Sequence, residues 1–288
     1  MAYSLLITVR EGLEAGLILA IILSYLARID QRRYWLHTWL GAAFAFAGSL
    51  GAGVVLEATA TSLSGEALEA MEGGAMLLAV IVLTTMIFWM KSQAVSIGAH
   101  LRQRVEVALR SGSALALAVL AFTAVGREGL ETVLFLFAGS STADSSSLYW
   151  IGAGAGLAIA AGLSYIVYAG AARLPLGPFF NFTGILLIVL AAGLLVNGLK
   201  ELHEIGVIAS LGPHVWDTYD IIADNSQLGR FLGTILGYDS SPYLGLVAAH
   251  VAYLALALAF FTLGRASGDR VARPAVASSP SERRRNEA

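Results

Sequence analysis

The chain has 288 residues, of which 57% are hydrophobic and only 13% charged, and its formal net charge is −2. A soluble domain normally carries about 25% charged residues, so this composition and its long apolar runs indicate an integral membrane protein. Cysteine is absent, which excludes disulfides, thiolate metal sites and thiol redox chemistry. No phosphate-binding loop or nucleic-acid-binding pattern is present, so we expect neither an ATP-driven pump nor a nucleic-acid partner.

In chain order, seven apolar segments are each close to the ~20 residues that a helix needs to cross the hydrocarbon core of a bilayer. They cover about 4–27, 36–56, 72–90, 113–138, 148–172, 179–200 and 243–264. Two other stretches are expected outside the hydrocarbon core. Residues 91–112 resemble an amphipathic helix on the cytoplasmic surface, and residues 265–288, rich in Ser, Pro, Arg and Ala, are expected to form a disordered cytoplasmic tail.

Basic side chains alternate along the connections between these segments. The connections after the first, third and fifth segments are basic, with Arg28, Lys91 and Arg173 among their residues, and so is the C-terminal tail. The other three connections are acidic. The positive-inside rule then places the N-terminus outside and the C-terminus in the cytoplasm. The predicted fold is an all-α integral membrane protein with seven transmembrane helices, located in the plasma or inner membrane.

One charged pentapeptide, Arg-Glu-Gly-Leu-Glu, occurs twice inside these apolar segments, at 10–14 and at 127–131. A charged side chain near the bilayer centre costs roughly 2.5–3.5 kcal/mol on insertion scales, so chance does not explain two matching sets. The copies lie in the first and fourth segments and therefore cross in opposite directions. This indicates an inverted repeat, about 4–90 against about 113–200, with 243–264 as an extra helix. Substrate sites in such proteins lie at the repeat interface near the midplane.

The two pentapeptides place acidic and basic side chains on matching helix faces, because residues three and four apart are neighbours on a helix. The predicted metal ligands are Glu11, Glu14, Glu128 and Glu131, supported by Arg10 and Arg127. Since small residues let helices approach closely in membranes, we expect the glycine in each copy to bring the first and fourth helices together. Antiparallel crossing would level Glu11 with Glu131 and Glu14 with Glu128.

Four carboxylates without cysteine, and without histidine in either motif, make a hard all-oxygen site. Such a site suits hard cations rather than copper(I) or structural zinc. Two other interpretations remain open. The charges could be intrahelical ion pairs, Arg10 with Glu14 and Arg127 with Glu131, that hold the bundle together. They could also form a proton relay without metal, since intramembrane carboxylates carry protons in pumps and transporters.

The doubled Arg-Glu-x-x-Glu motif resembles the oxidase-dependent iron permease family, which includes fungal high-affinity iron permeases and bacterial iron-uptake permeases. The resemblance extends to Glu72-Gly73 and to a Leu-Thr-x-Met-x-x-Trp-Met run at 83–90, and it spans most of residues 1–264. It implies a permease domain over 1–264 that is no enzyme and that imports iron as its substrate, with no permanently bound cofactor. It further implies Fe(III) supplied by a partner that oxidises Fe(II): a multicopper ferroxidase, or periplasmic cupredoxin-like and haem-peroxidase proteins.

Further acidic residues are predicted on the outer face. Glu69 and Glu72 begin the third apolar segment, and Glu201 and Glu204 follow the sixth. They could be the first iron ligands on the outside, because an acidic surface concentrates cations. The alternative is that they are solvated charges, and an acidic residue at a helix N-terminus is also favourable in itself.

Two other functions compete with Fe(III) import. One is a carrier for divalent Fe(II), Mn(II) or Pb(II). The other is a membrane redox enzyme with a di-iron carboxylate site, but such sites pair Glu with Glu-x-x-His, and both motifs here lack the histidine. Without a nucleotide site, the energy for import is expected from the membrane potential or a proton gradient.

Overall fold

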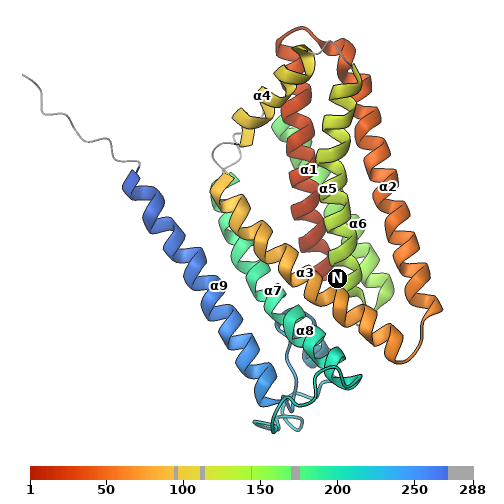
Figure 1. Ribbon diagram of the computed structural model, residues 1–288, viewed down its shortest axis with the longest axis vertical. Helices are drawn as coiled ribbons and strands as arrows, with labels where there is room; N and C mark the ends of the chain where they lie inside the picture. The colour runs from red at the N-terminus through yellow and green to blue at the C-terminus, as the bar shows by residue number, and fades with distance from the viewer. Residues whose placement is uncertain (94–96, 111–113, 144, 170–175, 272–288) are drawn as a thin grey trace, which may run out of the picture.

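A computed structural model describes residues 1–93, 97–110, 114–143, 145–169 and 176–271 (Figure 1). Within these ranges the chain forms helices and no strand, apart from one isolated bridge between His214 and Tyr243. The elements are α1 (Ala2–Arg28), η1 (Arg32–Tyr34), α2 (Trp35–Ser62), α3 (Glu66–Gln93), α4 (Ile97–Arg110), α5 (Ala114–Ser140), α6 (Ser146–Tyr168), α7 (Leu176–Glu204), α8 (Gln227–Leu236) and α9 (Leu244–Val271).

Five helices in the described ranges are long and apolar enough to cross a membrane, namely α2, α3, α6, α7 and α9. The remaining two predicted spans are α1 and α5, each 27 residues long. Both exceed the ~20 residues that a span requires, but each contains the three charged residues of a pentapeptide. The all-α fold is therefore confirmed, while the number of seven spans and their orientation stay predictions.

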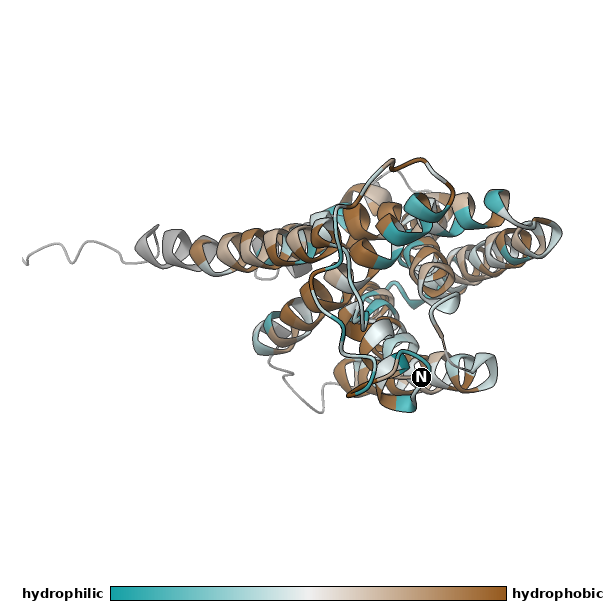
Figure 2. Ribbon diagram, turned by 90° about the horizontal axis from the view of Figure 1, so that it is seen from below, coloured by the Kyte–Doolittle hydropathy of each residue, from teal (hydrophilic) through white to brown (hydrophobic). Residues whose placement is uncertain are grey.

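The helices pack in pairs around α1 and α5, and the glycine contacts show that α1/α6 and α2/α5 run parallel while α3/α7 run antiparallel. α1 packs mainly against α6, α2 against α5, and α3 against α7. α1 and α5 also contact each other, so the two pentapeptide helices lie at the centre of the arrangement. Figures 1 and 2 both show α9 projecting from the side of the bundle, where it contacts α7.

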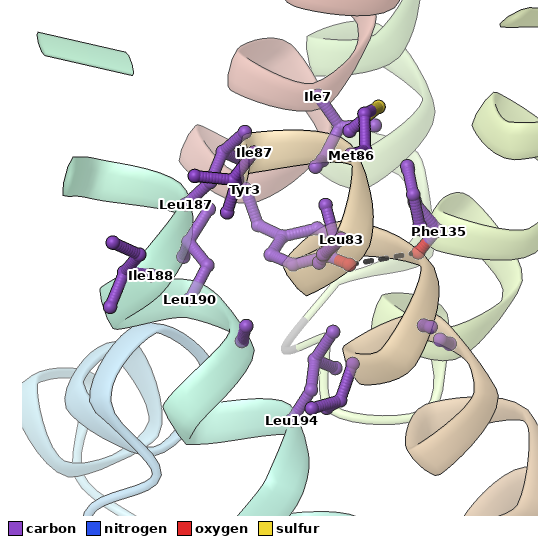
Figure 3. Close-up of a cluster of buried hydrophobic side chains, with 14 of the residues drawn as sticks. Tyr3, Ile7, Leu83, Met86, Ile87, Phe135, Leu187, Ile188, Leu190 and Leu194 are labelled. Atoms are coloured by element: carbon purple, nitrogen blue, oxygen red, sulfur yellow. Dashed lines mark hydrogen bonds between the residues drawn. The ribbon is translucent and has the colours of Figure 1, made fainter. Parts of the chain in front are cut away.

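The largest buried cluster joins α1, α3, α5 and α7 (Figure 3). Its centre is Tyr3, whose hydroxyl donates a hydrogen bond of 3.0 Å to the carbonyl oxygen of Phe135. Tyr149 of α6 stacks on Tyr3 and donates to the carbonyl of Leu136 over 2.7 Å. Because buried tyrosine hydroxyls need partners, these two bonds fix α1 and α6 against α5 at the end of the bundle where α1 begins, hereafter the N-terminal end.

The connection between α7 and α9 folds over the N-terminal end, drawn at the bottom of Figure 1. Lys200 pairs with Asp239 over 2.7 Å. Asp224 accepts hydrogen bonds from the backbone and hydroxyl of Ser240. The ten-residue helix α8, which the sequence did not predict, begins at an N-cap, Ser226, whose hydroxyl accepts from the Gly229 N–H.

Two predicted segments differ from the structure in extent. α9 continues to Val271, so the first residues of the expected tail are helical, and 272–288 lie outside the described residues. The amphipathic helix expected at 91–112 is confirmed over Ile97–Arg110 as α4, which buries Leu101 and Val105. Residues 91–93 belong to α3, and 94–96 and 111–112 lie outside the described residues. The position of α4 on a cytoplasmic membrane surface stays a prediction.

Candidate metal centre

The carboxylates of the two pentapeptides converge where α1 and α5 meet. One oxygen each from Glu11, Glu128 and Glu131 lie within 4.8 Å of one another. Glu14, one turn along α1, lies close enough for its charge to act on both Glu128 and Glu131. The four side chains thus form a single group. They do not form the two separate pairs, Glu11 with Glu131 and Glu14 with Glu128, that antiparallel crossing predicted. Glu11 approaches Glu128 as well as Glu131.

Each arginine pairs with both glutamates of its own motif. Arg10 lies 3.1 Å from Glu11 and 3.2 Å from Glu14. The Nε of Arg127 lies 3.3 Å from Glu128 and 3.1 Å from Glu131. The pairs four residues apart were predicted. The pairs with the adjacent glutamates were not, because residues one apart do not face each other along an ideal helix.

The two arginines occupy different environments, which the sequence repeat did not reveal. The Arg10 side chain is 3% exposed and donates a hydrogen bond of 3.3 Å to the sulfur of Met86. The Arg127 side chain is 43% exposed, and its guanidinium lies 4.7 Å from the ring centroid of Trp89. Met86 and Trp89 are both on α3, so one helix that carries neither pentapeptide contacts both arginines.

Every one of the four carboxylates has an oxygen without a hydrogen bond. Within the described ranges these oxygens are Glu11 Oε2, Glu14 Oε1, Glu128 Oε2 and Glu131 Oε2, and all are buried. Glu14 Oε1 is in ion-pair range of Arg10 but accepts no hydrogen bond from it. Buried polar atoms are normally satisfied. Four buried carboxylate oxygens in one group therefore match what a hard cation requires of its ligands.

The glycines of the pentapeptides do not lie between α1 and α5, as had been predicted, but face other helices. A Cβ on Gly12 would lie 2.8 Å from the Cβ of Ala160 in α6, and one on Gly129 would overlap the Ser49 side chain of α2. The glycines therefore permit close packing of α1 on α6 and of α5 on α2, rather than of α1 on α5. The carboxylates are positioned indirectly, because these two tight pairs fix the rotation of α1 and α5.

A cavity of about 660 Å³ opens beside the carboxylates, between α1, α2, α5 and α6. Glu11 and Glu128 line it at one end and Glu57 of α2 lines it at the other. Ser49 and Thr132 lie between them. The sequence reasoning missed both hydroxyl residues, although Thr132 follows Glu128 by four positions and so shares its helix face.

The predicted outer ligands form a second acidic group at the N-terminal end. One carboxylate oxygen each from Glu69, Glu201 and Glu204 lie within 4.8 Å of one another. Glu72 is outside this set of three, but its carboxylate experiences the charges of Glu69 and Glu57. All these side chains are partly or fully exposed, so their clustering alone does not distinguish an ion site from solvated charges.

Comparison with known proteins assigns the chain to a family. The model of the iron permease FTR1 family matches residues 1–268. The ferrous iron permease EfeU of Shigella sonnei (strain Ss046) is 36% identical over 272 residues, which cover 94% of this chain and 98% of that relative. The ferrous iron permease EfeU of Yersinia pestis is 35% identical over 260 residues, covering 90% and 92%. The chain belongs to the iron permease FTR1 family.

The permease is thus a membrane transporter for iron and no enzyme, as the doubled motif predicted. This excludes the di-iron redox enzyme as its function. No solved structure matches the permease.

Proposed function

We propose that the permease imports iron across the plasma or inner membrane, with its N-terminal end outside, by binding the ion at the carboxylates of the two pentapeptides. The observation that carries this proposal is the set of four buried carboxylate oxygens without hydrogen bonds, one from each of Glu11, Glu14, Glu128 and Glu131. Ion pairs that only stabilised the bundle would not require Glu11, Glu128 and Glu131 to bring one carboxylate oxygen each within 4.8 Å of one another. Arg10 and Arg127 orient the carboxylates and reduce the net charge of the ionised group to roughly −2.

The donor set favours Fe(III) as the bound species. The four ligands are hard oxygens, and the residues that line the group include neither cysteine nor histidine. The remaining charge of roughly −2 attracts a multivalent cation of either oxidation state, so the preference for Fe(III) comes from the hardness of the oxygen ligands. The relatives are named ferrous iron permeases, which fits an Fe(II) supply oxidised before import. The same names favour the second candidate, direct Fe(II) transport, which the uptake experiment below separates.

The inverted repeat also remains a proposal, and the glycine contacts support it. The pentapeptides place equivalent positions of α1 and α5 117 residues apart, and we pair α2 with α6 at a spacing of 111, which makes Gly41 equivalent to Gly152. Gly41 of α2 lies against the carbonyl of Ala118. The repeat makes Gly41 equivalent to Gly152 of α6, and Ala118 equivalent to Met1. Gly152 in turn lies against the carbonyl of Met1. One close contact is therefore repeated in the other half.

The same spacing of 111, applied to α3 and α7, pairs Gly73 with Gly184 and Ile87 with Gly198. A Cβ on Gly73 would lie 3.2 Å from the carbonyl oxygen of Gly198. The equivalent pair is Gly184 with Ile87. A Cβ on Gly184 would lie 3.7 Å from Ile87 Cγ2. Exchanging the halves therefore maps these two contacts onto two other observed contacts, as expected for a two-fold axis in the membrane plane. Such an axis places α1 and α5, and hence the carboxylates, at the repeat interface.

Iron is proposed to reach the permease from an extracytoplasmic ferroxidase or a peroxidase- or cupredoxin-like partner. Glu69, Glu201 and Glu204 are suited to receive it, with Glu72 nearby, because they form a partly exposed acidic group at the N-terminal end. Import of a trivalent ion down a potential of 100 mV releases about 7 kcal/mol at ~2.3 kcal/mol per charge. No nucleotide hydrolysis is then needed.

Radio-iron uptake by cells tests the proposal. Glu11→Ala and Glu131→Ala are expected to abolish uptake, whereas the exposed Glu66, also on α3 at the N-terminal end, provides the control variant Glu66→Ala. Near-normal uptake in either site variant would end the assignment. Uptake under a strong reductant, with no oxidising partner present, would establish the Fe(II) alternative and exclude Fe(III) delivery.

A further inference from the structure

We infer that iron reaches the central carboxylates through the cavity between α1, α2, α5 and α6, and that Glu57 is the first ligand on this path. This access route rests on the proposed function of Glu11 and Glu128 as iron ligands. It differs from a direct path along α3 and α7, where the outer acidic group lies.

The cavity connects the N-terminal end of the bundle with the central carboxylates. Its inner end is lined by Glu11 and Glu128, which are 1% and 4% exposed. Each presents a buried oxygen without a hydrogen bond. Its outer end is lined by Glu57, five residues before the end of α2, and by Ser140, the last residue of α5. One continuous space therefore joins an exposed carboxylate to two buried ones.

Polar groups recur at helical spacing along the walls of the cavity. On α2, Ser49, Gly53, Glu57 and Thr61 are each four positions apart, so they share one helix face. On α5, Glu128, Thr132 and Ser140 share a face in the same way. Both stripes face the same cavity. An ion moving inward would meet side-chain oxygens from both helices, interrupted at Gly53 of α2 and Leu136 of α5.

The hydroxyl groups on these stripes are available as acceptors. Ser49 donates its proton to the carbonyl of Ala45 over 3.0 Å. Thr132 donates to the carbonyl of Glu128 over 2.7 Å. Because each proton is already used within its own helix, the remaining lone pairs can accept hydrogen bonds from water around a cation or bind the cation directly.

The cavity is large enough for a hydrated ion. At ~30 Å³ of liquid volume per water, its 660 Å³ holds on the order of twenty waters, several times the first shell of an iron ion. The other wall residues are apolar, including Phe46, Leu50 and Val54. They offer no competing ligand that would trap the ion before it reaches Glu11 and Glu128.

The direct line from the outer acidic group is closed by packed side chains. The α3–α7 interface is filled by fully buried apolar residues such as Met76, Leu83 and Leu194 (Figure 3). Glu57, by contrast, is near enough to Glu72 for their charges to interact. It thus links the outer acidic group to the cavity.

Thiol labelling tests whether water fills the cavity, and it requires no iron. The chain has no native cysteine. Gly154 lines the cavity and Gly51 does not, and a side chain at either position would meet no atom within 4 Å. A charged, membrane-impermeant thiol reagent added outside is expected to modify Gly154→Cys at least about tenfold faster than Gly51→Cys. Equal rates would overturn the route, and no reaction at either position would mean that lipid fills the cavity.

Uptake kinetics test the role of Glu57. Glu57→Gln is expected to raise the apparent KM for iron about tenfold, as loss of electrostatic focusing predicts, with little change in maximal rate. Glu57→Asp should restore most of the affinity, and Glu66→Gln should have no effect. An unchanged KM in Glu57→Gln would refute its role as first ligand even if Glu11→Ala abolishes uptake. Normal uptake in Glu11→Ala would instead refute the proposed function.

Discussion

Replacing Gly12 by alanine should damage the iron site without touching any proposed ligand. The new Cβ would lie 2.8 Å from the Cβ of Ala160 and 3.4 Å from a terminal carbon of Leu157. Non-bonded carbons prefer about 3.5–4.0 Å, so α1 and α6 must separate by roughly 1 Å at this point. Both Cβ atoms are attached directly to the backbone, and no rotamer change can relieve the overlap.

Two effects should follow from that separation. Overpacking of this kind costs about 1–3 kcal/mol. Glu11 adjoins Gly12 and Glu14 lies two positions on, so the shift also moves both carboxylates relative to Glu128 and Glu131. Metal sites tolerate displacements of only about 0.2 Å from ideal ligand distances, so we expect iron affinity to fall by at least about tenfold.

The assay combines thermal unfolding of the purified permease with iron uptake. Gly162→Ala, also on α6 but outside the cavity lining, is the matched control, because its Cβ would meet no atom within 4 Å. The double variant Gly12→Ala/Ala160→Gly moves the methyl group from one helix to the other and should recover most of both losses. Full stability and uptake in Gly12→Ala, or a double variant no better than the single one, would refute the packing argument.

Two further predictions concern charged pairs. Arg10→Gln should destabilise the permease by about 3–5 kcal/mol, because it leaves buried carboxylates without a counter-charge. Arg127→Gln should cost only about 1 kcal/mol, since that side chain is 43% exposed; equal losses in thermal unfolding would contradict the difference in environment. Burial raises the pKa of Asp239, but hydrogen bonds from Lys200 and the Ser241 N–H outweigh it and lower the pKa below the usual 3.8. This pair therefore stabilises the fold above pH ~4 and loses its contribution as the pH falls through the lowered pKa. Asp239→Asn should be less stable than the parent by about 1 kcal/mol at pH 7, and the difference should shrink below pH 4; a constant difference would contradict the assignment.

The sequence predicted those features that depend on local periodicity. Helix lengths followed from apolar runs, and the convergence of the carboxylates followed from a motif duplicated at 10–14 and 127–131. Features that depend on which helix packs against which could not be predicted. Gly12 faces α6 and Gly129 faces α2 because α1 and α5 each have a closer partner than each other.

The inequality of the arginines has a similar origin. Two identical motifs predict identical environments. However, α3 contacts both motifs with different side chains, Met86 against Arg10 and Trp89 against Arg127. α8 was missed for another reason. It is only ten residues long, and its position depends on contacts such as the hydrogen bond from Thr234 to the carbonyl of Thr142, 92 positions away.

The most direct test of the central claim is X-ray absorption spectroscopy, with metal quantification, on the purified permease loaded with iron. The account predicts one iron ion per chain in a shell of oxygen ligands only. This signal should disappear in Glu11→Gln/Glu128→Gln and persist in Glu66→Gln. Iron bound in undiminished amount and with the same shell in the double variant would contradict the claim that the two pentapeptides form one iron site.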